Sequence, residues 1–121
     1  MKVEITAEPQ KNETGREQIV LANGNSEIKD YIRSLWGDET ERAFEIVNCE
    51  SGWKTAIISR TNDVGLFQIN LAAHWAQIPG EDRAEKILWL QNWRNNVEFA
   101  YMLWADQGWR PWVCSRIKNY L

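Results

Sequence analysis

With 121 residues, the chain is long enough for one domain with a single hydrophobic core. Its formal net charge of −3 argues against a nucleic-acid partner, because phosphate binding needs clustered lysine and arginine. No apolar run is long enough to span a membrane, and no apolar core follows Lys2 to make a signal peptide, so we expect any leader to be missing from this sequence.

The first part of the chain shows weak periodicity. Residues 1–24 are therefore predicted to form an extended or poorly ordered N-terminal arm. A folded domain is expected over residues 25–121. Its first helix is predicted to begin at Ser26, a good capping residue, and to run to about Trp36, where Gly37 ends it.

The next predicted helix carries the most informative residue of the chain. It begins at Asp38-Glu39-Thr40-Glu41, which has the form of a capping box. Ala43, Ile46 and Val47 recur at helical spacing, and Glu50 continues the same face one turn later. Burial disfavours the charged form of a carboxyl, so Glu50 is expected to have a raised pKa and to serve as a general acid near neutral pH. The structural alternative is a buried Glu50 that caps a helix or pairs with an arginine.

The second half of the domain is predicted to be mostly helical. Residues 51–70 are rich in Ser, Gly, Thr and Asn and are expected to form loops with a short hairpin. The helices expected after them are a short one at 71–78, another at 82–91, a central buried one at 95–107, and a last one from Pro111 toward Tyr120.

Two cysteines, Cys49 and Cys114, and one histidine, His74, are the soft metal ligands that the chain offers. A structural zinc site normally takes four, so neither a metal nor another cofactor is predicted. A Cys–His hydrolase using Cys49 and His74 is one alternative. A single disulfide is favoured instead. It would close a loop of about 65 residues, contribute roughly 4 kcal/mol by chain entropy, and place the protein outside the reducing cytoplasm.

A specific motif follows Glu50 at short range: Gly65-Leu66-Phe67-Gln68-Ile69-Asn70. Glu50-Ser51-Gly52 followed by this motif resembles the lysozyme-like superfamily and, within it, the soluble lytic transglycosylase domain. The slightly longer Asp63–Asn70 segment is also similar to the active-site strand of animal (C-type) lysozymes.

The two ends of the domain resemble a third group. Cys49 immediately before Glu50, together with Gln107–Ser115 near the C-terminus, is similar to bacterial resuscitation-promoting factors. The two cysteines of that family are linked, which implies a Cys49–Cys114 disulfide here. The resemblances together cover about residues 39–116.

The resemblance implies a mainly α (α+β) lysozyme-like fold, with a helical domain and a small β-hairpin region beside an active-site cleft. It makes Glu50 the catalytic acid, and Trp112 resembles the apolar tryptophan that raises the pKa of that acid in lysozymes. The other substrate-binding residues that it implies are Ser59, Gln68, Trp53 and Tyr101.

Each of these residues also has a structural reading. Gln68 can tie the loop backbone together, and Trp53 can anchor a loop. Tyr101 and Trp112 can simply pack in the core.

The role of Asp63 distinguishes two possible reactions, hydrolysis and lytic transglycosylation. A hydrolytic glycosidase usually needs a second carboxylate, and Asp63 matches that of animal lysozymes by its motif. Lytic transglycosylases generally lack one and use the 6-hydroxyl of the sugar, which leaves an anhydro end. The spacing from Glu50 to Asp63 is shorter than expected for the animal enzymes, and Asn62-Asp63 is also a common turn pair.

The expected function is cleavage of the β-1,4 bond between N-acetylmuramic acid and N-acetylglucosamine in peptidoglycan, with Glu50 as general acid and lytic transglycosylation favoured. The alternatives are a hydrolytic muramidase that uses Asp63 and a non-catalytic cell-wall-binding module. The expected partners are peptidoglycan glycan strands, with no nucleic acid and no membrane span. We expect a monomer that works outside the cytoplasm or is secreted.

Overall fold

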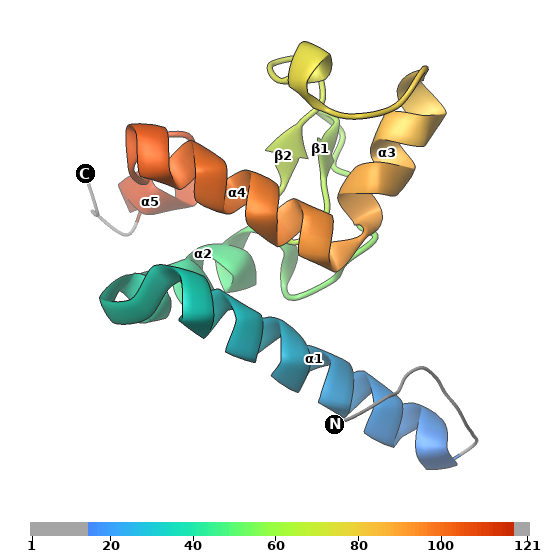
Figure 1. The fold of residues 1–121 in the computed structure, drawn as a ribbon, viewed down its shortest axis with the longest axis vertical. Coiled ribbons are helices and arrows are strands. Elements are labelled where there is room, and N and C mark those ends of the chain that lie inside the picture. Colours follow the sequence, from blue (N-terminus) through green and yellow to red (C-terminus); the bar gives the residue numbers. More distant parts are fainter. Residues whose placement is uncertain (1–14, 118–121) are drawn as a thin grey trace. The chain divides into compact units, whose positions relative to one another are not determined.

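The computed structural model describes the backbone of residues 15–117 and the side chains of residues 25–115 (Figure 1). The chain divides into two compact units, residues 1–31 and 32–121, and the division falls inside the first helix, α1 (Gly15–Trp36). Within the described residues, no helix combines the length and the apolar character needed to cross a membrane.

The predicted start of the first helix at Ser26 is wrong, because α1 already begins at Gly15. Residues 15–24 are therefore helical rather than extended, and residues 1–14 of the predicted arm lie outside the described residues. No proline follows Pro9 until Pro79, and Gly24 inside a helix costs only about 1 kcal/mol, so nothing in this stretch stops a helix. The predicted end is correct, since α1 stops at Trp36 and Gly37 has a φ of 52°.

The second unit contains short helices around one small sheet. Its elements in chain order are the 3₁₀-helix η1 (Gly37–Glu39), α2 (Thr40–Ser51), β1 (Asp63–Val64), β2 (Ile69–Asn70), the 3₁₀-helix η2 (Trp75–Gln77), α3 (Arg83–Gln91), α4 (Trp93–Gln107) and α5 (Val113–Ile117). The fold is thus mainly helical with a small hairpin, as the sequence predicted.

Several predicted boundaries differ from the structure. The expected capping box is wrong: Glu39 occupies the N-cap of α2 without a side-chain cap, while Thr40 Oγ1 donates to the carbonyl of Gly37 at 2.6 Å. A 3₁₀ turn therefore leads into α2. The helix expected at 71–78 shrinks to η2, and Pro111 precedes α5 rather than opening it. Tyr120, the predicted end of the last helix, lies outside the described residues.

The hairpin pairs two very short antiparallel strands. Asp63 lies opposite Asn70 and Val64 opposite Ile69, and Ile58 forms a single bridge to Val64 on the other side. Figure 1 shows α4 crossing the hairpin, with α3 beside β1. The hairpin is therefore held by helices rather than by a larger sheet.

Helix α4 begins two residues earlier than predicted. The side chain of Asn92 accepts a hydrogen bond from the Asn95 N–H and caps the helix. Val97 and Ala100 are fully buried, but Met102 is 48% exposed. The central helix predicted at 95–107 is therefore buried on one face, while its other face meets water.

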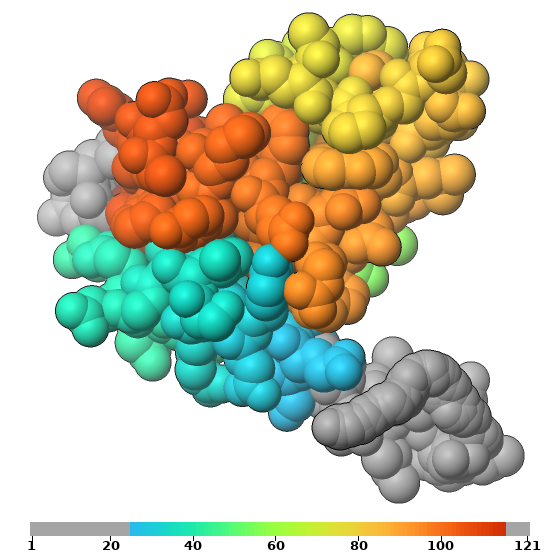
Figure 2. Space-filling view, viewed as in Figure 1, coloured from blue at the N-terminus to red at the C-terminus, as the bar shows by residue number. Residues whose placement is uncertain are grey.

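Aromatic rings fill the core between the end of α1, the hairpin loop and the residues after α4. Trp36 stacks on Phe67 at 5.3 Å on one side and on Trp109 at 6.2 Å on the other. Trp112 completes the group against Phe67 and Trp109. On the face drawn in Figure 2, α4 meets the residues of η1 and α2 along one continuous seam.

Candidate active site

Glu50 lies in the last turn of α2, as the helical spacing predicted. Ala43, Ile46 and Val47 are fully buried, and Glu50 is half-buried on the same face. The helix ends one residue later because Gly52, with a φ of 62°, directs its N–H back to the carbonyls of Val47 and Asn48. The carboxyl is therefore anchored on a rigid helix, next to the loop that leads to the hairpin.

Burial raises the pKa of the Glu50 carboxyl above its ordinary value of 4.5. A hydrogen bond from the backbone N–H of Cys114 to Glu50 Oε2, at 3.4 Å, acts in the opposite direction by stabilising the charged form. The negative charge of Asp63 raises the pKa of Glu50 further. No lysine or arginine whose side chain is described pairs with Glu50, so the ion-pair alternative finds no support.

Asp63 sits at the start of β1 and is surrounded by donors. Ser59 Oγ and Thr61 Oγ1 donate to Asp63 Oδ2 at 2.9 and 2.5 Å. Asn70, its partner across the hairpin, donates through Nδ2 to Asp63 Oδ1 at 2.9 Å. We call Ser59, Thr61 and Asn70 the Asp63 cage. It fixes the carboxylate in one orientation, close enough for its charge to act on Glu50.

A disulfide joins the helix of Glu50 to the end of the chain. Cys49 and Cys114 are bonded with an S–S distance of 2.05 Å, in agreement with the prediction. The same link excludes the Cys–His hydrolase, because Cys49 has no thiol to act as a nucleophile and His74 lies against Phe99 and Gln77.

Three of the residues that were predicted to bind substrate make contacts within the protein. Gln68 has a φ of 52° and donates through Nε2 to the carbonyl of Gly65 at 3.0 Å, so it ties the hairpin loop together. Trp53 packs edge-on against Phe44, and Tyr101 packs edge-on against Trp36. These contacts fit the structural readings, and a role in substrate binding stays a prediction for all three.

Trp112 is buried rather than open to a ligand. Its indole Nε1 donates to the carbonyl of Phe67 at 2.9 Å, and its ring lies against Phe67 and Trp109. It stands two residues before Cys114, whose N–H reaches Glu50. Trp112 therefore helps to hold the stretch of chain whose N–H reaches the acid, and direct contact of Trp112 with the acid stays a prediction.

Three features of the site were not predicted from the sequence. Thr61 and Asn70 belong to the Asp63 cage, and neither was singled out as a site residue. Asn96 is fully buried, donates to the carbonyls of Val64 and Leu90, and accepts from the N–H of Phe67. Its helical spacing from the apolar Phe99, Ala100 and Leu103 places Asn96 on the buried face of α4, and this is the signal that would have found it.

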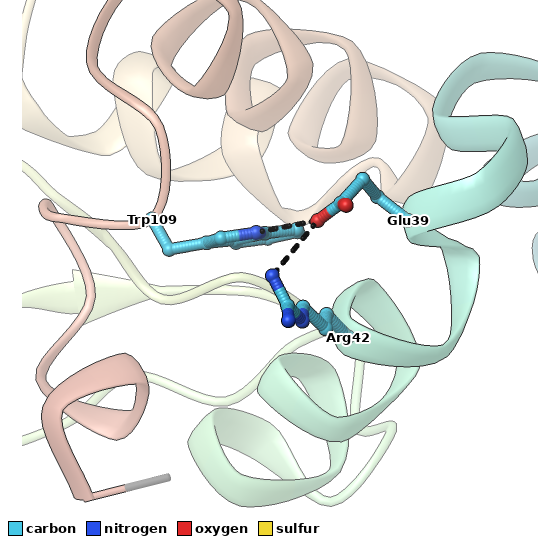
Figure 3. A network of polar contacts seen from close by, with 3 residues as sticks. All are labelled: Glu39, Arg42 and Trp109. Atoms are coloured by element: carbon cyan, nitrogen blue, oxygen red, sulfur yellow. Dashed lines mark hydrogen bonds and ion pairs between the residues drawn. The ribbon is translucent and has the colours of Figure 1, made fainter. Parts of the chain in front are cut away.

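Glu39 and Trp109 fix the other end of the segment after α4. Trp109 Nε1 donates to Glu39 Oε1 at 3.1 Å, and Arg42 Nη1 lies 3.5 Å from the same oxygen (Figure 3). Both charged side chains come from η1 and α2, while Trp109 follows α4. The start of α2 and its end are thus both attached to the same stretch of chain.

A mainly helical domain with a half-buried carboxyl at the end of a helix and a second carboxyl on a short hairpin has the arrangement of a lysozyme-like domain. The model of the family described as the transglycosylase SLT domain matches residues 30–103. This match spans more than half of the 121 residues, so the chain belongs to that family, which cleaves peptidoglycan by lytic transglycosylation. The match includes Glu50 and Asp63 and ends before Cys114. No curated protein and no solved structure matches the chain significantly.

Proposed function

We propose that this chain cleaves the β-1,4 bond between N-acetylmuramic acid and N-acetylglucosamine in peptidoglycan, with Glu50 as the general acid. The environment of Glu50 carries the proposal. The carboxyl is half-buried without a cationic partner among the described side chains, and its pKa is raised by burial. A carboxyl that keeps its proton toward neutral pH can protonate the leaving oxygen of a glycosidic bond.

In the proposed reaction, Glu50 gives its proton to the glycosidic oxygen as the bond to C1 of N-acetylmuramic acid breaks. The 6-hydroxyl of the same sugar then attacks C1, and the Glu50 carboxylate takes the proton of that hydroxyl. The product carries a 1,6-anhydro ring, and Glu50 returns to its protonated form. This route needs one catalytic carboxyl, which agrees with the family to which the chain belongs. Because the substrate is peptidoglycan, we also propose that the protein acts outside the cytoplasm.

Hydrolysis is the second candidate, and the Asp63 cage is the observation that favours it. The cage holds a carboxylate close enough to raise the pKa of Glu50. A second carboxylate of this kind can act as nucleophile or as base toward water. The two candidates differ in their products, since hydrolysis leaves reducing ends and the anhydro product is one water lighter.

The test compares Glu50→Gln with Glu45→Gln, a matched control at an exposed position of the same helix. We expect Glu50→Gln to lose about 100-fold or more in clearing of a peptidoglycan suspension, the usual size of a general-acid effect, and Glu45→Gln to remain within about twofold. Mass spectrometry of the soluble products from the parent protein then assigns the reaction.

Binding separates an enzyme from a wall-binding module. Glu50→Gln is expected to sediment with insoluble peptidoglycan as the parent protein does. If the parent protein sediments but releases no soluble product, the non-catalytic alternative is correct. If Glu50→Gln clears the suspension at the full rate, Glu50 is not the acid.

A further inference from the structure

The residues around Cys114, whose backbone N–H reaches Glu50, form a short stretch with several attachments. We call residues 109–115 the C-terminal segment. Trp109 is held by Glu39 at 3.1 Å (Figure 3), and Trp112 is held by the carbonyl of Phe67 at 2.9 Å. Ser115 is fully buried and donates to the carbonyl of Trp112 at 2.7 Å. The segment is thus fixed both to η1 and to the hairpin loop.

The disulfide attaches the far end of this segment directly beside the acid. Cys49 precedes Glu50 in α2, and its partner Cys114 donates its backbone N–H to Glu50 Oε2 at 3.4 Å. Helix α5, which contains Cys114, packs against α2. The disulfide therefore holds the backbone N–H of Cys114 against the carboxyl of Glu50, the residue that follows Cys49.

The groups that face Glu50 come from three elements. Ile46 and Val47 lie on its own helix and are fully buried. Asp63 on β1 is the charged group whose field raises the pKa of Glu50, and the Cys114 N–H on α5 is the donor that lowers it. Burial has the largest effect of all. The disulfide between α5 and α2 therefore holds one of the groups that act on the acid, the Cys114 N–H.

We propose that Cys114 is a positioning residue for Glu50, and that its disulfide with Cys49 keeps the C-terminal segment closed over the acid. The inference rests on the proposed role of Glu50. A dithiol reductant would open the site in two thiol–disulfide exchanges. Each protein sulfur gains one electron and one proton, and the dithiol becomes a cyclic disulfide. The acid then becomes more exposed to water and loses the Cys114 hydrogen bond. We expect the first change, which lowers its pKa, to outweigh the second, which raises it.

The first test leaves the disulfide intact. The titration of the Glu50 carboxyl carbon is followed by NMR and assigned by comparison with Glu50→Gln. The amide proton of Cys114 is expected to shift with the same midpoint in the parent protein and to lose that transition in Glu50→Gln. A Cys114 amide that does not respond to Glu50 would overturn the proposal, and this measurement needs no enzymatic activity.

The second test opens the disulfide, by a dithiol and separately in the double variant Cys49→Ala with Cys114→Ala. The Glu50 midpoint is expected to fall toward 4.5 in both, and the alkaline limb of the activity profile to move to lower pH by the same amount. The dithiol should change nothing further in the double variant. An unchanged or higher Glu50 midpoint in folded, reduced protein would overturn the proposal.

Leu90→Ala is the control for stability alone. Leu90 is fully buried on α3, and its loss should lower the melting temperature without moving the Glu50 midpoint. If Leu90→Ala moves the midpoint as far as reduction does, the disulfide acts only through general stability and the proposal fails. If Glu50 titrates as expected but Glu50→Gln remains active, the proposed function fails while the positioning of Glu50 stands.

Discussion

The two carboxyls of the site, Glu50 and Asp63, have different surroundings. Glu50 is half-buried behind apolar side chains and accepts one long hydrogen bond, from a backbone N–H. Asp63 accepts hydrogen bonds from three side chains of the Asp63 cage. Burial without strong donors favours the protonated form of Glu50. These surroundings are the ones that the proposed general acid requires.

The raised pKa of Glu50 predicts how stability depends on pH. A carboxyl whose pKa is higher in the folded than in the unfolded state stabilises the fold below its unfolded value, here 4.5, and that contribution is lost as pH rises through the folded pKa. Glutamine stays neutral throughout. The free energy of unfolding of Glu50→Gln minus that of the parent protein should therefore increase from about pH 4 to about pH 8 in urea titrations. A difference that falls with pH would contradict the raised pKa of Glu50.

Asp63→Asn tests whether the second carboxyl takes part in the chemistry. If the reaction ends through the 6-hydroxyl, Asp63 mainly organises the hairpin. The variant should then lose about 1 kcal/mol of stability, keep most of its rate and still release anhydro products. Asp38→Asn, at an exposed position of η1, is the matched control. A loss of several orders of magnitude, together with reducing-end products from the parent protein, would identify a muramidase instead.

At the residue scale, the sequence predicted positions that follow from helical spacing. It did not predict contacts that form only when distant parts of the chain fold together. Glu50 was found because a helical period places it on the same face as Ala43, Ile46 and Val47. Thr61 contacts Asp63 through the shape of a loop, and Cys114 acts through a backbone N–H. Neither contact depends on a recognisable side-chain pattern, so neither could be predicted.

At the scale of elements, the hairpin is too short to fix itself and relies on α4. Asn96 reaches from α4 to the carbonyl of Val64 and the N–H of Phe67, which lie on either side of Gly65. A Cβ on Gly65 would lie 2.3 Å from Asn96 Nδ2, and Gly65 has a φ of 80°, so only glycine fits against this amide. The turn of the hairpin and the side chain of Asn96 therefore form one unit.

Asn96→Ala should be far more damaging than its neighbour Asn95→Ala. Removing Asn96 deletes three buried hydrogen bonds, to backbone groups of Val64, Phe67 and Leu90, and a buried group left unsatisfied costs about 1–3 kcal/mol. We expect a loss of about 3 kcal/mol or more in urea unfolding, with a drop in activity as the hairpin loosens. Asn95 donates one side-chain bond, to the carbonyl of Trp89, and should cost about 1 kcal/mol. Equal losses for the two variants would show that Asn96 does not hold the hairpin.

The helices themselves were predictable, but their ends were not. Periodicity predicted α2, α3 and α4, because each buries one face. The start of α1 was misjudged because Ser26 is a good cap but is also tolerated inside a helix. The capping box predicted at Asp38 is replaced by the 3₁₀-helix η1. The hydrogen bond between Trp109 and Glu39 is a tertiary contact that competes with local capping of α2.

At the scale of the whole molecule, every described residue of the site and the aromatic core belongs to the second unit, residues 32–121. The three attachments of the C-terminal segment, to Glu39, to Phe67 and to Cys49, also lie within this unit. The described residues of the site therefore come from one compact part of the chain.

This arrangement predicts that a chain starting at Asn25 keeps the function of the full sequence. Such a chain retains the α1 residues from Asn25 to Trp36, including the buried Ile32. We expect its peptidoglycan-clearing rate to lie within about twofold of the parent rate, and its melting temperature to fall by only a few degrees, about the effect of 1 kcal/mol. A folded truncation with strongly reduced clearing would show that the N-terminal residues bind the glycan. Sedimentation with insoluble peptidoglycan would then separate lost binding from lost catalysis, because a chain that only binds less should recover its rate at high substrate.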